Sequence, residues 1–384
     1  MDKELIRFIQ DMYKTKGPIP LHAPTFIGKE QDYVRETIES TFVSSVGKFV
    51  DEFEQKIEVY TGSPKAVATV NGTAALHAAL YSIGVTTGDY VITQAMTFVA
   101  TANAIHHLGA EPIFLDVSRI SLSLCPVALE NFLLEHAELR ETGCFHKKNN
   151  RQIKAVIPMH TFGHPAELDE ILAICNKWHL VLIEDAAESL GSFYKGRHTG
   201  TIGNLGVLSF NGNKIITTGG GGMILCNNKK EGARLKHLTT TAKRPHPYEF
   251  YHDEAGFNYR LPNINAALGC AQMESLPTFI EQKREIAKRY QSFFENTEFE
   301  FISEPSYAKS NYWLNAIVCP DQATRDALLE STNKVGVMTR PIWKLMHRLP
   351  MFQHAYRDKL KTSKWLEKQL INLPSSPILR NNLC

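Results

Sequence analysis

The sequence predicts an α/β protein with a large, mostly parallel sheet and a small C-terminal α+β domain. Up to about residue 260, short apolar runs alternate with helical stretches, which is typical of crossover connections between parallel strands. The run 180–183 is apolar at every position, as expected for a strand that is covered on both faces. After residue 260, a long helical stretch replaces this alternation.

The elements of the large domain follow in order from these periodicities. The predicted strands are 66–70, 90–93, 112–117, 154–158 and 180–183, followed by a short apolar strand before Lys214. The predicted helices are 73–82, 98–108 and 166–178. The stretch 140–151 is polar and rich in Lys, Asn and Arg, so we expect an inserted surface loop there.

The C-terminal part has a different pattern. Residues 263–296 have helical spacing, interrupted only at Pro277, and predict a long connecting helix. Beyond it we expect the elements of a small domain: a strand at 312–318, a helix at 322–331, a turn at Gly336 and a terminal helix at 361–370. We therefore divide the chain into a large domain with the N-terminal segment, residues 1–260, and a connecting helix with the small domain, residues 261–384.

Composition argues against several functional classes. The 384 residues carry a net charge of +2 with 21% charged residues, too balanced for electrostatic nucleic-acid binding. The seven cysteines form no CxxC pair, which argues against a zinc ribbon or disulfide framework and favours a reducing compartment. The N-terminus is charged, and no run approaches the ~20 apolar residues of a membrane helix. We expect a cytoplasmic protein with no nucleic-acid or membrane partner.

The strongest functional signal surrounds Lys214. This lysine follows an apolar strand and precedes four glycines, 219–222, while Ser209 stands five residues before it. Asp185 ends another apolar strand, at the edge where open α/β sheets bind ligands. An amine nucleophile, a buried acid and a phosphate-sized turn are what pyridoxal 5'-phosphate (PLP) requires. The sequence therefore predicts PLP attached to Lys214, with Asp185 keeping the pyridine nitrogen protonated.

Each of these features, taken alone, has a second interpretation. Gly72 and Thr73 begin a helix after a strand, which suits an anion site but also an ordinary helix start. Asp185 could pair with an arginine or cap the next helix. Phe98 could stack on a flat ring or lie in the core. Ser209 alone could be an ordinary serine at a strand end, and only its spacing to Lys214 makes it a candidate for the site.

Nucleotide loops and metal sites find little support. Lys214 precedes the glycines, so GxxxxGK[ST] is not matched, and no GxGxxG follows the first strand. His160 and His164 are four residues apart, but Gly163 and Pro165 prevent a shared helix face. We therefore predict no metal.

Five motifs in order give the chain a recognisable signature. It resembles the DegT/DnrJ/EryC1/StrS family of PLP-dependent nucleotide-sugar aminotransferases from about residue 20 to the C-terminus. The motifs are 72–76, 97–104, 184–187, Ser209-Phe210 with Lys214, and 256–260. The resemblance implies a fold-type I aminotransferase.

The resemblance also implies roles around the cofactor ring. Lys214 would hold the cofactor and carry the proton, and Asp185 would pair with the pyridine nitrogen. Phe98 and Ala187 would cover the two faces of the ring. Glu188 would lie at the ring hydroxyl, where the family often has another polar residue.

At the phosphate, the resemblance implies Gly72, Thr73 and Ser209. Asn258 would reach the same phosphate from a neighbouring subunit, which implies a homodimer with shared active sites. Lys243, His246 and Arg260 are candidates for substrate binding near the mouth of the site, or for ordinary surface contacts.

The segments 42–50, 239–243 and 339–343 resemble the legionaminate/bacillosamine branch, although Gly220 replaces the family's usual glutamate. The branch implies transfer from glutamate to C4 of a UDP-linked 2-acetamido-4-keto-2,4,6-trideoxyhexose, for surface glycan biosynthesis. The alternatives are a 3-aminotransferase, a dTDP- or GDP-sugar 4-aminotransferase, and a regulator on the same scaffold. Some relatives are 3-dehydratases without the lysine, so Lys214 argues against that activity.

Overall fold

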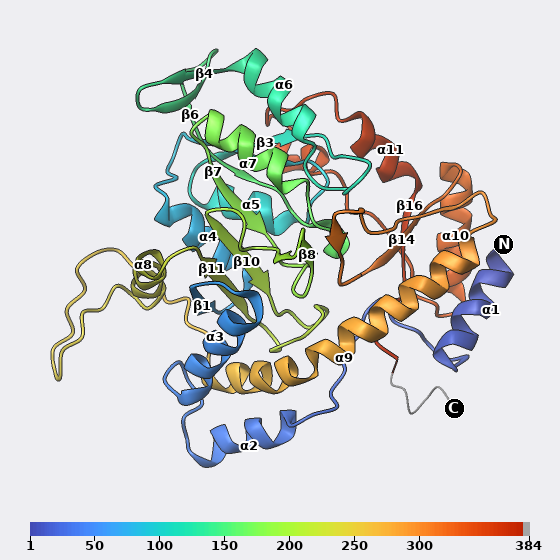
Figure 1. The fold of residues 1–384 in the computed structure, drawn as a ribbon, viewed down its shortest axis with the longest axis horizontal. Helices are drawn as coiled ribbons and strands as arrows, with labels where there is room; N and C mark the ends of the chain where they lie inside the picture. Colours follow the sequence, from blue (N-terminus) through green and yellow to red (C-terminus); the bar gives the residue numbers. More distant parts are fainter. Residues whose placement is uncertain (379–384) are drawn as a thin grey trace.

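The computed structural model describes residues 1–378, and a nine-stranded sheet forms its centre (Figure 1). The strands of this sheet are β1 (Lys65–Thr69), β2 (Tyr90–Gln94), β3 (Glu111–Leu115), β4 (Ala137–Arg140), β5 (Gly143–His146), β6 (Gln152–Ile157), β7 (Val181–Asp185), β10 (Leu205–Ser209) and β11 (Gly222–Cys226). Their order is β1-β11-β10-β7-β6-β2-β3, with β5 added beside β6 and β4 beside β5.

The strands β10, β7, β6, β2 and β3 run parallel, as predicted. The strand β11 is antiparallel to both of its neighbours, β1 and β10, so the sheet is mixed. Because parallel strands end at one edge, the carboxyl ends at Gln94, Asp185 and Ser209 lie along the same side of the sheet.

Helices cover both faces of the sheet, which explains the continuous apolar strands. One face carries α4 (Gly72–Ser82), α5 (Val99–His107) and α8 (Lys229–Thr239). The opposite face carries α3 (Lys48–Thr61), α6 (Pro126–His136), α7 (Leu168–Lys177) and α9 (Asn263–Phe294). In β1, Val67 packs with the first group and Ala66 and Ala68 with the second, which is the alternation of a strand buried on two sides.

The predicted connecting helix is confirmed: α9 runs across the molecule with Pro277 inside it (Figure 1). The helix α2 (Glu30–Glu39) packs along it. The C-terminal part holds a four-stranded antiparallel sheet and two helices: β12 (Glu300–Phe301), β14 (Asn315–Val318), β15 (Arg340–Pro341), β16 (Leu370–Leu373), α10 (Gln322–Lys334) and α11 (Lys361–Gln369). A third sheet is formed by β8 (Phe193–Tyr194), β9 (Arg197–His198) and β13 (Ala308–Lys309).

The N-terminal helix α1 (Asp2–Tyr13) packs on the C-terminal elements. Its Leu5 and Ile9 share a buried cluster with Ile286 and Tyr290 of α9 and with Leu328 of α10. The division at residues 260 and 261 remains a prediction.

One sequence expectation is corrected. The stretch 140–151, expected to be a loop, contains the last residue of β4 and all of β5 in the hairpin β4–β5, whose second strand pairs with β6 through Cys144 and Ile153. The hairpin strands are only four residues long, too short for an alternation of apolar and polar residues to stand out from the polar stretch beside them. Among residues 1–378, no helix is both long and apolar enough to cross a membrane.

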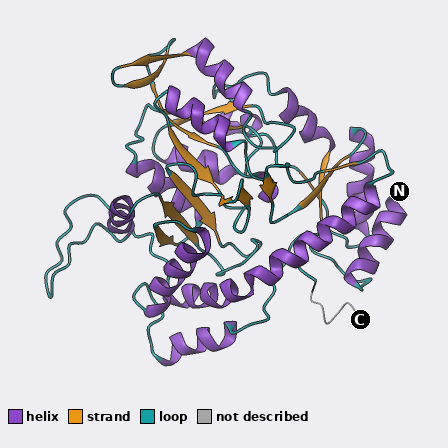
Figure 2. Cartoon of the chain, in the orientation of Figure 1, coloured by secondary structure: helices purple, strands orange, loops and turns teal. Residues whose placement is uncertain are grey.

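After α8, residues 240–258 project from the body of the molecule, and we call this segment the arm. Figure 2 draws the arm as loop, and in Figure 1 it is the yellow segment that extends beyond α8. At its base, Asp253 accepts from His237 Nε2 at 2.7 Å and from Arg244 Nε at 2.7 Å. At its tip, Tyr248 and Phe250 are largely exposed.

Candidate active site

Asp185 occupies the carboxyl end of β7 and is only 3% exposed. Its Oδ2 accepts a hydrogen bond from Thr101 Oγ1 at 2.7 Å, and its Oδ1 accepts from the Ala187 N–H at 3.2 Å. Burial raises the pKa of Asp185, and the hydrogen bonds oppose this shift. The carboxyl group is therefore held in one orientation at the ligand-binding edge of the sheet.

Lys214 lies in the turn after β10, five residues beyond the last strand residue, Ser209. Its Nζ is 3.5 Å from Glu188 Oε1 and 4.1 Å from the centroid of the Trp313 ring. The indole of Trp313 donates to the carbonyl oxygen of Asn213 at 2.8 Å, which fixes the ring beneath the lysine. The amine is thus held between an acid and an aromatic wall.

Glu188 is the acid that faces this amine. It is 3% exposed, and its second oxygen accepts from the Phe162 N–H at 2.9 Å. Burial raises the pKa of Glu188 to about 7, although the charge of Lys214 lowers it. Near neutral pH the Glu188 carboxyl group can therefore either hold or release a proton next to Lys214.

The predicted phosphate residues converge at the start of α4. Asn71 caps this helix by accepting from the Ala74 N–H at 2.8 Å, so the amides of Gly72 and Thr73 lie in its open first turn. A Cβ on Gly72 would lie 3.1 Å from Ser209 Cβ, a contact tighter than side chains normally make. Gly72, Thr73 and Ser209 therefore form a narrow cradle of donors that suits a phosphate group.

Phe98 and Ala187, the two residues predicted to cover the cofactor ring, both lie near Asp185. Phe98 immediately precedes α5, its side chain is half exposed, and Thr101 of the same first turn bonds Asp185. Ala187 donates its own N–H to Asp185. Both residues are therefore placed close to the buried acid, and their contacts with the cofactor remain a prediction.

The remaining predicted residues belong to the arm or its base. Asn258 accepts from Arg260 Nε at 3.1 Å, and the neighbouring Tyr259 accepts from the Val70 N–H at 2.8 Å. Lys243 lies over the Phe250 ring, and His246 accepts from an arm amide. Figure 1 shows the arm projecting away from the body of the molecule beyond α8.

The comparisons with known proteins decide the family. Residues 24–383 match the DegT/DnrJ/EryC1/StrS aminotransferase family. The chain belongs to this family. It is similar to EpsN of Bacillus subtilis (strain 168), with 36% identity over 93% of this chain and 90% of the relative. It is also similar to the GDP-perosamine synthase of Escherichia coli O157:H7, with 35% identity over 94% of each chain.

A solved structure supports the same conclusion. The aminotransferase TlmJ from Streptoalloteichus hindustanus superposes with a TM-score of 0.84 at 27% identity, covering 94% of each chain. As a member of the DegT/DnrJ/EryC1/StrS family, the chain has the fold-type I architecture and is a PLP-dependent nucleotide-sugar aminotransferase. The regulator that the sequence left open is therefore excluded.

The residues of this DegT/DnrJ/EryC1/StrS member fit PLP. Lys214 offers the amine for covalent attachment, Asp185 a buried acid for the ring nitrogen, and the cradle a set of phosphate donors. When bound, PLP supplies an electron sink for the substrate carbon that exchanges its amine.

Sequence reasoning missed two residues of the site. Thr101 stands three positions after Phe98 in a helix, so its spacing could have indicated that it shares the edge with Asp185. Trp313 is distant in sequence and reaches Lys214 only through the packing of the C-terminal segment. No local pattern signals such a contact.

Metal ligation is not favoured at the residues considered for it. The His160 ring bonds Glu184 at 3.0 Å and accepts from the Ala166 N–H at 3.1 Å. A separate group, His237, Asp253 and Glu254, lies within 4.8 Å at the arm base. Its two carboxylates already pair with arginines, Arg244 and Arg234.

Proposed function

We propose that the chain transfers the amino group of glutamate to C4 of a UDP-linked 2-acetamido-4-keto-2,4,6-trideoxyhexose in the cytoplasm. The observation that carries this proposal is the position of Lys214, whose amine faces Glu188 at the edge where Asp185 lies. Aminotransfer requires a positioned amine that can exchange with a substrate ketone or amine and then carry a proton. The choice of sugar is supported by the segments 42–50, 239–243 and 339–343 described above.

Three side chains of the protein would have different roles in the transfer. Lys214 would move the proton between the substrate carbon and the cofactor. Asp185 would face the ring nitrogen of PLP, and Thr101 and the Ala187 N–H hold its carboxyl oxygens in one orientation. Glu188 lies 3.5 Å from the Lys214 amine, and because its pKa of about 7 lies near neutral pH, its carboxyl group can take up or release a proton beside that amine.

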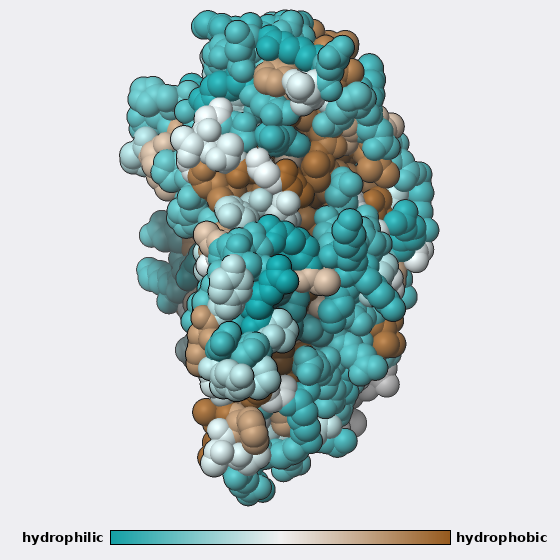
Figure 3. All heavy atoms as spheres, turned by 90° about the vertical axis from the view of Figure 1, so that its left-hand side faces the viewer, coloured by the Kyte–Doolittle hydropathy of each residue, from teal (hydrophilic) through white to brown (hydrophobic). Residues whose placement is uncertain are grey.

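We further propose that the enzyme is a homodimer in which the arm reaches the partner's active site. The arm exposes Tyr248, Phe250 and Tyr251, which a second subunit would cover. Figure 3 shows the face from which the arm projects, where apolar surface lines a hollow beside polar residues. In this arrangement Asn258 would bind the phosphate across the interface. Lys243, His246 and Arg260 would meet the nucleotide sugar.

A GDP-linked 4-keto-6-deoxy sugar is the second candidate substrate. Its support is the similarity to GDP-perosamine synthases, at 35% identity for the Escherichia coli O157:H7 protein and 33% for that of Vibrio cholerae.

The test offers UDP-, GDP- and dTDP-linked 4-keto-6-deoxy sugars to the purified enzyme with glutamate and determines the products by mass and NMR. We expect amination at C4 of the UDP-linked N-acetylated sugar, with stoichiometric 2-oxoglutarate. The Lys214→Ala variant serves as the control and should form no product. Efficient amination of the GDP sugar, without reaction of the UDP sugar, would establish the second candidate instead, and amination at C3 would overturn both.

A further inference from the structure

Asn311 joins the two groups that lie beside the Lys214 amine. It stands just before β14, and its side chain is fully buried. Its amide nitrogen donates to the backbone carbonyl oxygens of Glu188 and Leu190, both at 2.9 Å. Its amide oxygen accepts from the Trp313 N–H at 2.8 Å. One side chain thus binds the backbone of the acid that faces Lys214 and the backbone of the aromatic residue that lies against it.

These contacts close a ring around the amine. The Trp313 indole donates to the carbonyl oxygen of Asn213, the residue that precedes Lys214. The Lys214 Nζ lies 3.5 Å from Glu188 Oε1, and the carbonyl oxygen of Glu188 accepts from Asn311. Because the members of this ring are buried and hydrogen-bonded to one another, loss of the Asn311 amide would release both Glu188 and Trp313.

The Asn311 side chain fits its place closely. A Cβ on Gly163 would lie 1.9 Å from Asn311 Oδ1, so any other residue at position 163 would displace the amide. The backbone N–H of Asn311 donates to Ser192 Oγ at 2.9 Å, and this hydroxyl donates to the Gly163 carbonyl oxygen at 2.7 Å. A buried amide that uses both its donors and its acceptor is costly to move, so Asn311 is held in one position.

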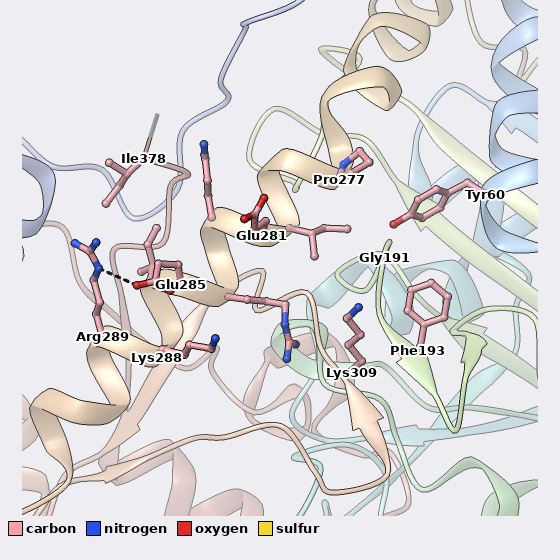
Figure 4. A pocket seen from close by; sticks show the side chains of 14 residues that line it. Tyr60, Gly191, Phe193, Pro277, Glu281, Glu285, Lys288, Arg289, Lys309 and Ile378 are labelled. Carbon is pink, nitrogen blue, oxygen red and sulfur yellow. Dashed lines mark hydrogen bonds and ion pairs between the residues drawn. The ribbon is translucent and has the colours of Figure 1, made fainter. Parts of the chain in front are cut away.

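The loop that carries Glu188 has less support on its other side. Gly191, three residues after Glu188, lines a cavity of about 690 Å³ between α9 and the hairpin β8–β9. Figure 4 shows Gly191 at this cavity beside Tyr60 and Phe193. Since residues 1–378 leave this space unfilled, packing holds the loop incompletely there, and the hydrogen bonds from Asn311 hold it from the opposite side.

We propose that Asn311 is a positioning residue for aminotransfer, which keeps Glu188 and Trp313 at fixed places beside the Lys214 amine. The inference rests on the roles proposed above for Lys214 and Glu188. Without the Asn311 amide, the loop would loosen and water would reach the Glu188 carboxyl group. Because burial is the main cause that raises the pKa of Glu188 to about 7, this pKa should then fall toward its ordinary value.

The test follows the protonation of Glu188 by infrared difference spectroscopy in the full-length, cofactor-free protein, and the carboxyl band that Glu188→Gln removes identifies the group. Asn311→Ala and the polar substitution Asn311→Ser should both lower the midpoint of this titration by about one pH unit or more. Lys214 and Asp185, the charged groups that act on Glu188, are unchanged in both variants. This measurement needs no substrate, so a wrong donor or sugar in the proposed function would leave its result intact.

A second measurement follows the half-reaction of the holoenzyme with glutamate. Both Asn311 variants should lower its maximal rate by about tenfold or more, because the groups beside the amine are misplaced. The glutamate concentration at half-maximal rate should change little, since Asn311 acts on Glu188 and Trp313 rather than on the substrate. A maximal rate that neither variant lowers would overturn the positioning role.

Asn263→Ala is the matched control for a general loss of stability. Asn263 is also buried, and its side chain joins two backbone segments by accepting from the Phe49 N–H at 3.1 Å and donating to the Phe42 carbonyl oxygen at 2.6 Å. This variant should unfold at a lower temperature and leave the Glu188 midpoint unchanged. The same midpoint in the wild type and in the folded Asn311 variants, or an equal shift in Asn263→Ala, would overturn the proposal.

Discussion

The Nζ of Lys214 lies 3.5 Å from Glu188 Oε1, and both side chains are largely buried. Burial disfavours the charged form of an acid, while a neighbouring ammonium favours it. The first effect is larger here, since the pKa of Glu188 is raised to about 7. Near neutral pH the Glu188 carboxyl group can therefore gain or lose a proton beside the Lys214 amine.

The Lys214→Ala variant should fold but form no product, because it lacks the amine that faces Glu188. Half-reactions with glutamate should fall by at least about a hundredfold, the lower end of what a positioned proton carrier contributes. The measurement is cofactor absorbance after addition of glutamate in a single turnover. Turnover at the rate of the unmodified enzyme would disprove the assignment of Lys214.

The Asp185→Asn variant should keep the cofactor but lose most of the rate, because a neutral amide no longer favours the protonated ring nitrogen. Thr101→Val is a milder change at the same site, because it removes one hydrogen bond of 2.7 Å to Asp185 and leaves the acid in place. We expect a smaller rate loss for Thr101→Val than for Asp185→Asn. Stopped-flow half-reactions measure both, and an equal loss in the two variants would contradict the orienting role of Thr101.

The raised pKa of Glu188 predicts that the free energy of unfolding depends on pH. An acid whose pKa is raised in the folded state binds its proton more tightly there than in the unfolded chain. It therefore contributes stability at low pH that is lost as the pH rises through about 7. Relative to Glu188→Gln, the cofactor-free wild type should become less stable between about pH 5 and pH 8. Thermal unfolding of both proteins measures this, and a difference that does not vary with pH would mean that the group is not buried in solution.

Much of the fold was predictable because its strands and helices carry strong local patterns. The long helix α9 was predicted almost to its ends, since 32 residues of helical spacing outweigh the single Pro277. The hairpin β4–β5 was not, because it depends on pairing with β6 rather than on its own residues. The antiparallel direction of β11 also escaped prediction, since an apolar run of five residues has no preferred direction.

In the active site, too, some residues could be predicted from local sequence patterns and others could not. Asp185 ends one apolar strand and Lys214 follows another, and these positions together with the family motifs indicated both residues. The packing of Trp313 against Lys214 could not, since it joins segments about a hundred positions apart and is held by the Asn213 carbonyl. The buried Lys283 is a further example: its Nζ donates to the Trp313 and Ser375 carbonyl oxygens, which no helical spacing reveals. Tertiary contacts of this kind lie beyond what one sequence indicates.

The last prediction concerns the proposed dimer. If the arm places Asn258 at the partner's phosphate, each active site needs Lys214 from one chain and Asn258 from the other. Asn258→Ala should then impair activity strongly, and the Lys214→Ala protein should be inactive. Mixed and allowed to exchange subunits, the two variants should form heterodimers with one complete site, so up to about a quarter of the wild-type activity should return at equal mixing.

The control for this experiment is a mixture of Lys214→Ala with Asp185→Asn. Both residues lie at the same edge of one chain, so in a heterodimer of these variants each site has one defect and neither site is complete. This mixture should therefore stay inactive, and recovery in it would contradict the placement of Lys214 and Asp185 in one chain's site. For Lys214→Ala with Asn258→Ala, residues that serve the same chain's site would likewise put one defect into each site, whereas residues from different chains put both defects into one site and leave the other complete. The double variant Lys214→Ala/Asn258→Ala mixed with wild type therefore distinguishes the arrangements. If the sites are shared, its heterodimer has a defect in both sites and activity falls below that of the unmixed proteins, whereas sites within single chains leave it unchanged.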